Sequence, residues 1–94
     1  MDQHREEIRS GIAEIAWDEL QLFYAKGQVI QIHSDMDLEE VGYQLCMDNA
    51  SLLETWIREG LVGRISDDTA RNWIDSKAKV RSVVIQPWVL VQEL

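Results

Sequence analysis

The chain has 94 residues and a formal net charge of −8; 46% of the residues are hydrophobic and 28% are charged. This length and composition predict one folded domain spanning residues 1–94, and they argue against extensive disorder. The single cysteine, Cys46, rules out an internal disulfide, and the sequence shows no secretory leader and no apolar run of membrane-spanning length. We therefore expect a cytoplasmic protein, bacterial in style, that has no membrane partner.

The acidic side chains are concentrated in the N-terminal half of the chain. Residues 1–50 carry 11 acidic and 3 basic side chains, whereas residues 51–94 carry 6 of each. The N-terminal half should therefore repel polyanions such as nucleic acids. Solubility alone is the simpler explanation for this charge, and we prefer it.

The N-terminal segment predicts one or two helices. The first runs from Asp2 to about Ala16, because apolar residues recur there at helical spacing, namely Ile8, Ile12 and Ile15. Gly11 lies inside this helix and costs up to ~1 kcal/mol relative to alanine. Residues 17–25 continue the helix or begin a second one, and Gly27 is a natural C-terminal stop.

A short strand and a capped helix follow. Residues 28–33, with the sequence QVIQIH, alternate polar and apolar side chains, which predicts a strand. Asp37 is a good N-cap for a helix over residues 38–48. Glu40, at the third helical position, completes a pattern like a capping box.

The middle of the chain has the spacing of a helix–turn–helix. A second amphipathic helix, capped by Asn49 or Ser51, runs to Glu59 and ends at Gly60. With a helix and a strand before it and strand residues after it, the pattern resembles that of a winged helix. Any compact helical hairpin produces the same pattern, and we prefer that interpretation.

A DNA-reading helix would be basic, and the second helix of this hairpin is not. Arg58 is its sole cation, against Glu54 and Glu59. A basic patch could form further along the chain, although acidic residues are interspersed with its members, which are Arg64, Arg71, Lys77, Lys79 and Arg81. Nucleic-acid binding is therefore the weaker hypothesis.

The remaining segments predict one more helix and a β-rich C-terminus. Residues 61–66 form a connector or a short strand, and Asp67 caps a helix that runs to about Ser76. Residues 80–94 are dominated by Val, Ile and Trp, which predicts one strand bent near Pro87 or two strands in succession. Their nearly continuous apolar content predicts a central or interface strand, buried on both faces by helices of the same chain or by a second copy.

Motifs for catalysis, cofactors or metals are missing. The glycines do not form a phosphate-binding loop, and His4, His33 and Cys46 lack the spacing of a zinc site. The acidic run at residues 35–40 lacks the glycine and glutamate of an EF-hand loop. We expect Cys46 to be buried and inert, and we expect no catalytic residue, no metal and no cofactor. An enzyme would need a site built from dispersed residues such as Glu19, His33 and Asp35.

The chain is rich in tryptophan for its length, with Trp17, Trp56, Trp73 and Trp88. Core packing is the preferred interpretation of these side chains. The alternative is that one of them anchors a partner, and Trp88 beside Pro87 is the candidate contact.

Four segments carry a likeness to known proteins. They are Trp17, Glu19 and Leu20; Asp37, Leu38, Glu40 and Val41; Trp56, Gly60 and Leu61; and residues 87–93, PWVLVQE. Together, in this order, they resemble a small bacterial family known only as a domain of unknown function. The resemblance spans nearly the whole chain, and it implies no catalytic residue because it brings no known activity with it.

The observations together predict an α+β fold. About four helices, including a central helical hairpin, should pack on a small sheet that has a long C-terminal strand. The expected core is Ile12, Leu20, Ile30, Leu38, Val41, Leu45, Leu53, Trp56, Trp73, Val84, Trp88 and Leu90. The preferred function is a non-enzymatic interaction or regulatory module, which binds a second copy as a homodimer or binds another protein. A winged-helix nucleic-acid binder and an enzyme with a dispersed site are the alternatives.

Overall fold

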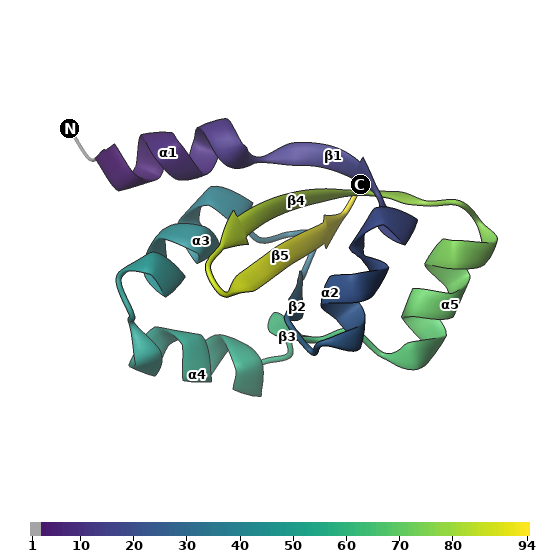
Figure 1. The fold of residues 1–94 in the computed structure, drawn as a ribbon. Coiled ribbons are helices and arrows are strands. Elements are labelled where there is room, and N and C mark those ends of the chain that lie inside the picture. Colours follow the sequence, from purple (N-terminus) through teal and green to yellow (C-terminus); the bar gives the residue numbers. More distant parts are fainter. Residues whose placement is uncertain (1–2) are drawn as a thin grey trace.

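The computed structural model describes residues 3–94, which form a mixed five-stranded sheet with helices on both of its faces (Figure 1). The strand order is β1 (Ala13–Ala16), β4 (Lys79–Ile85), β5 (Trp88–Glu93), β2 (Val29–Ile32), β3 (Val62–Arg64). Strand β5 is parallel to β2, and the other neighbours are antiparallel. The helices are α1 (Gln3–Gly11), α2 (Gln21–Ala25), α3 (Leu38–Cys46), α4 (Ala50–Arg58) and α5 (Asp67–Asp75), and a 3₁₀ helix, η1 (Trp17–Leu20), precedes α2.

The α+β class is confirmed, and the element count differs from the expectation of about four helices. Within residues 3–94 there are five α-helices besides η1. The predicted helix over residues 2–16 is wrong in its second half, because α1 ends at Gly11 and residues 13–16 pair with β4 as an edge strand. Pairing with a distant strand outweighs the local helical stripe. The expected start at Asp2 lies outside the described residues.

Side chains at the helix starts explain where three of the helices begin. Asp37 and Asn49 accept hydrogen bonds from the first turns of α3 and α4, so the cap of α4 is Asn49 and not Ser51. The predicted cap of α5 is wrong by one residue. The hydroxyl of Ser66 accepts the capping bond, at 3.1 Å, and Asp67 is the first residue of the helix.

The C-terminal segment forms a hairpin of two strands, β4 and β5, which turns at a cis Gln86–Pro87 bond. Strand β5 lies between β4 and β2 in the sheet. Val89 and Val91 face one helical layer and Leu90 faces the other, because side chains alternate along a strand. Helices of the same chain therefore cover both faces of this apolar strand.

Two hydrophobic clusters lie on the two faces of the sheet. The first contains Trp17, Leu20, Val29, Ile65, Ala70, Trp73, Val80, Val89 and Val91, under η1 and α5. The second contains Ile8, Ile32, Leu38, Val41, Val62, Val83 and Leu90, under α1 and α3. Figure 1 shows α1, α3 and α4 on one side of the hairpin and α2 with α5 on the other.

The expected core is confirmed in part. Five of its members are buried, namely Leu20, Leu38, Val41, Trp73 and Leu90. Five more are partly buried and pack against the second cluster: Ile12, Ile30, Leu45, Trp56 and Trp88. Leu53 is half-buried, and Val84 is exposed at 56%, so its placement in the core was wrong. Alternation puts Val80 and Val84 on the same side of β4, and the helices of that side cover Val80 but not the far end of the strand.

Gln92 is a buried polar residue at the end of β5, with 3% exposure. Its side-chain amide donates to the carbonyl oxygens of His33, at 3.0 Å, and Met36, at 2.6 Å. Its Oε1 accepts from Arg81 at 3.4 Å. Gln92 therefore fastens the C-terminal strand to the loop that leads into α3.

Candidate binding groove

A groove of about 840 Å³ lies between α1, the end of α3 and the β4–β5 hairpin. Its lining comes from three segments: residues 4–11, residues 45–48 and residues 83–88. We call it the hairpin groove. Segments far apart in the sequence build it, because the sheet brings the hairpin beneath α1 (Figure 1).

The hairpin groove lies beside the end of β4 that has no neighbouring strand on its outer side. On the inner side, β5 pairs with β4 from Val80 to Ile85. On the outer side, β1 pairs only with residues 79–82, and the end of α1 takes the place of a strand beyond them. A Cβ at Gly11 would lie 3.5 Å from Cγ2 of Val83, so α1 packs closely against this end of β4 and forms a wall of the groove.

The two residues expected to contact a partner, Pro87 and Trp88, both line the hairpin groove. Pro87 is exposed in the hairpin turn, and Trp88 is half-buried against the second cluster. Val84, at 56% exposure, adds an apolar side chain to the same rim. The structure thus brings these residues together at one surface, and their contact with a partner remains a prediction.

The charge of the hairpin groove is negative. Its charged lining consists of Glu7 and Asp48, with no lysine or arginine, and His4 is the only basic-type side chain among the lining residues. Sequence reasoning did not assign either carboxylate to a site. No local pattern could have done so, because α1 and α3 lie far apart in the sequence and meet only in the fold.

Cys46 lies in the hairpin groove and is exposed, so the prediction of a buried thiol was wrong. Its Sγ lies 3.9 Å from Nδ1 of His4. The neighbouring Leu45 packs toward the second cluster instead. One position along a helix rotates a side chain by about 100°, which is enough to exchange a core position for a solvent-facing one.

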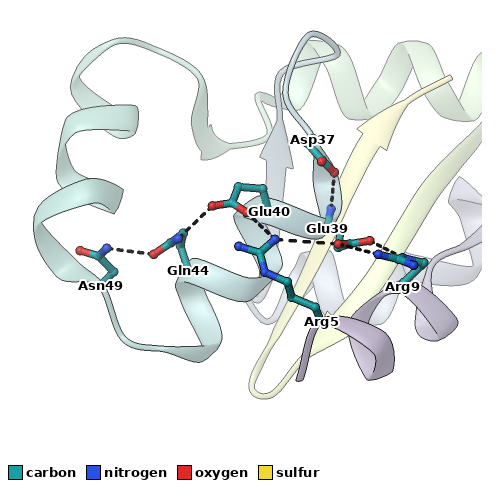
Figure 2. A network of polar contacts seen from close by, with 7 residues as sticks. All are labelled: Arg5, Arg9, Asp37, Glu39, Glu40, Gln44 and Asn49. Atoms are coloured by element: carbon teal, nitrogen blue, oxygen red, sulfur yellow. Dashed lines mark hydrogen bonds and ion pairs between the residues drawn. The ribbon is translucent and has the colours of Figure 1, made fainter. Parts of the chain in front are cut away.

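A network of ion pairs holds α1 against α3, and Figure 2 shows its members. Arg9 Nε donates to Glu39 Oε1 at 2.6 Å, and Arg5 Nη1 lies 2.6 Å from Glu40 Oε2. The guanidinium of Arg5 also lies over the ring of Tyr43, 4.1 Å from its centre. Because α1 forms one wall of the hairpin groove, this network helps to hold that wall in place on α3.

The network continues from α3 to α4. Gln44 donates from its Nε2 to Glu40 Oε1 at 2.9 Å, and Asn49 donates from its Nδ2 to Gln44 Oε1, also at 2.9 Å (Figure 2). The side chain of Glu40 therefore contacts Arg5 and Gln44. The sequence had instead predicted that Glu40 would complete a capping box with Asp37. Asn49 is also the cap of α4, so one chain of contacts joins three helices.

The carboxylates of the network are stabilised in their ionised form. The hydrogen bond from Arg9 lowers the pKa of Glu39 below its usual value, and the hydrogen bonds from Arg5 and then Gln44 lower the pKa of Glu40. The same contacts raise the pKa of both arginines. Two of the three basic side chains of the N-terminal half are thus already paired within the protein.

Of the three residues named for a dispersed enzyme site, His33 and Asp35 lie together and Glu19 does not join them. The backbone N–H of Asp35 donates to Nδ1 of His33 at 3.1 Å, in an exposed turn. Glu19 lies in η1 and forms no hydrogen bond or ion pair with either residue. The structure therefore joins two of the three and leaves Glu19 apart.

Residues 3–94 contain no group of three or more His, Cys, Asp or Glu side chains that could hold a metal ion. None of the helices in this range is long and apolar enough to span a lipid bilayer.

Comparisons with known proteins place nearly the whole chain in one family. The family model described as "Protein of unknown function (DUF2288)" matches residues 3–93. The fold is similar to the NMR solution structure of PA1075 from Pseudomonas aeruginosa, with a TM-score of 0.84 and 29% sequence identity. That similarity covers 99% of this chain and 86% of PA1075. A search of curated proteins found no match. The chain belongs to the DUF2288 family, a family whose members have no assigned function, as the resemblance in its sequence indicated.

Proposed function

We propose that this protein is a non-enzymatic interaction module that docks a segment of another protein in the hairpin groove. The observation that carries the proposal is the hairpin groove itself, where the exposed Val84 and Pro87 lie beside the half-buried Trp88. Apolar and aromatic side chains gathered in a concave surface are the usual anchors of a docked segment. The groove volume of about 840 Å³ lies within the range of ligand pockets, roughly 300–1,000 Å³.

Charge favours another protein over a second copy or a nucleic acid. Each molecule carries a net charge of −8, so two hairpin grooves meeting face to face would oppose Glu7 and Asp48 to their own copies. Arg5 and Arg9 are occupied by α3 carboxylates and offer little to a phosphate backbone. The exposed thiol of Cys46 suits a reducing compartment, and we place the module in the bacterial cytoplasm.

The proposal is tested by site-specific photo-crosslinking in the cells that naturally produce the protein. A benzoylphenylalanine is introduced at Val84 in one variant and at Ile57 in another. These positions are matched, with exposures of 56% and 57%, and Ile57 does not line the hairpin groove. We expect position 84 to form a discrete adduct with one other protein, identified by mass spectrometry, and position 57 to form none.

Three results would count against the proposal. The first is that positions 84 and 57 crosslink to the same proteins. The second is that position 84 forms no crosslinked adduct. The third is an adduct that contains only two copies of this chain, which would favour a homodimer over a different partner.

A further inference from the structure

We infer that the segment docked in the hairpin groove carries a lysine or arginine next to an apolar anchor residue. The cation would lie against Glu7 and Asp48, and the anchor against the apolar side chains around Trp88. This inference rests on the proposed function and specifies the chemistry of the partner segment. It concerns side chains alone and requires no particular backbone conformation of that segment.

The apolar part of the hairpin groove comes from both helices and from the hairpin. Ile8 and Leu45 line it from α1 and α3, and the strands add Val83, Ile85 and Trp88. Leu45, Ile85 and Trp88 are only half-buried where they pack on the second cluster, so part of each side chain is still in contact with solvent. An apolar side chain of the partner would remove this surface from water, which stabilises the complex.

The charged part of the groove consists of two exposed carboxylates. Glu7 lies on α1 and Asp48 follows the end of α3. Within residues 3–94 the carboxylate of Asp48 has no hydrogen-bond or ion-pair partner, and that of Glu7 accepts only a long hydrogen bond from Gln3, at 3.4 Å. Both carboxylates are therefore available to a cation from another protein, which can form charge-assisted hydrogen bonds with them.

The protein's own arginines on α1 are engaged elsewhere. Arg5 pairs with Glu40 of α3. Arg9 pairs with Glu39 in the same network (Figure 2). No lysine or arginine is among the residues that line the hairpin groove. A cation supplied by the partner would therefore complement the groove, whereas an acidic residue in its place would be repelled.

The test uses Cys46, the single cysteine of the chain, as a tether inside the hairpin groove. Three peptides compete for its exposed thiol: acetyl-Cys-Lys-Phe-amide, acetyl-Cys-Glu-Phe-amide and acetyl-Cys-Lys-Ser-amide. Each peptide is supplied as its mixed disulfide with mercaptoethanol. Attack by the Cys46 thiolate on the peptide sulfur forms the protein–peptide disulfide and releases mercaptoethanol, and an excess of free mercaptoethanol keeps the exchange at equilibrium.

Mass spectrometry of the intact protein measures the fraction of the chain linked to each peptide. Each ratio of two peptides is divided by the same ratio in concentrated urea, where the groove is absent, so that intrinsic differences between the peptide thiols cancel. We expect the Lys-Phe peptide to exceed the Glu-Phe peptide by about threefold or more, as an exposed ion pair would give. It should exceed the Lys-Ser peptide by about as much, because part of the phenyl ring is buried.

Two protein variants with equal net charge serve as a matched pair. The variant Glu7→Gln/Asp48→Asn removes both carboxylates of the hairpin groove, and asparagine tolerates the positive φ of 56° at position 48. The variant Glu54→Gln/Glu59→Gln removes two exposed charges from α4 and its end, outside the groove. We expect the first to abolish the preference for lysine over glutamate and the second to keep it.

The inference is overturned if the glutamate peptide is linked as readily as the lysine peptide, if both variants lose the preference equally, or if the phenyl ring adds nothing. A Cys46 thiol that reacts with none of the peptides would contradict the open groove on which the inference rests. A crosslinked partner at position 84 together with no preference among the peptides would overturn the inference and leave the proposed function standing. Absence of both the adduct and the preference would overturn both proposals.

Discussion

Replacing Gln92 with leucine tests how the C-terminal strand is joined to the rest of the fold. Leucine keeps much of the volume of the side chain and removes its amide. The carbonyl oxygens of His33 and Met36 then lose the hydrogen bonds that they accept from Gln92, and Arg81 loses its contact with Oε1. The loop between β2 and α3 would no longer be fastened to β5.

The magnitude follows from the two short hydrogen bonds. Each contributes about 0.5–1.5 kcal/mol net, so the free energy of unfolding should fall by roughly 1–3 kcal/mol. The contact with Arg81 adds little, because its length of 3.4 Å is near the limit for a hydrogen bond. For a domain of this size, the loss corresponds to a melting temperature lower by roughly 5–20 °C.

The measurement is thermal unfolding followed by circular dichroism, supported by a urea titration at constant pH. Gln86→Leu is the control, because Gln86 is an exposed glutamine in the hairpin turn, and its change should stay within about 0.5 kcal/mol. A Gln92→Leu protein as stable as the parent would show that the buried amide does not join the strand to the loop.

Three further predictions concern the network and the packing around the hairpin groove. Because the folded-state pKa values of Glu39 and Glu40 lie below the usual 4.5, the network stabilises the fold above that pH and loses this contribution as the pH falls through the lowered values. Urea midpoints measured from pH 7 to pH 3 should therefore converge with those of a Glu39→Gln/Glu40→Gln variant, and a constant difference would refute this. Val83→Ala should lower the free energy of unfolding, measured by urea titration, by about 2 kcal/mol, because Val83 is 3% exposed. Val84→Ala should change it by no more than about 0.5 kcal/mol, because Val84 is 56% exposed. Equal losses would contradict the burial of Val83 and the exposure of Val84. Gly42→Leu should lower the melting temperature and displace α1, because even a Cβ at position 42 would lie 3.1 Å from Cγ2 of Ile8 in α1. An NMR amide spectrum in which the signals of α1 are unchanged would be inconsistent with this packing.

Local signals in the sequence located many of the elements. The alternation of residues 28–33 predicted β2, the cap Asp37 predicted the start of α3, and one of the two candidate caps, Asn49, proved to start α4. The predicted stops Gly27 and Gly60 have φ values of 72° and 78°, which favour glycine at the end of a helix. In each case a few adjacent residues determine the conformation.

The errors arose where distant segments determine the structure. Residues 13–16 have a helical stripe, but their strand partner in β4 lies more than sixty positions later in the sequence. Val84 has the alternation of a core strand, but its exposure depends on how far the helices of the other layer extend. Neither property is encoded in the surrounding residues.

The candidate site was predictable only in its hairpin part. The unusual proline and tryptophan pair suggested Pro87 and Trp88 as contact residues, and both line the hairpin groove. Glu7 and Asp48 could not be added to them, because the packing of α1 on α3 is needed to place them nearby. The place where β1 stops pairing with β4 and α1 takes over as a wall of the groove was also beyond sequence reasoning, since it depends on where α1 ends.

The measurement that tests the account most directly is the amide spectrum of the ¹⁵N-labelled protein, recorded with and without the partner identified by crosslinking at position 84. Docking in the hairpin groove predicts shifts concentrated in residues 4–11, 45–48 and 83–88, which line it. Shifts confined to α4 and β3, or no shifts at all, would contradict the account.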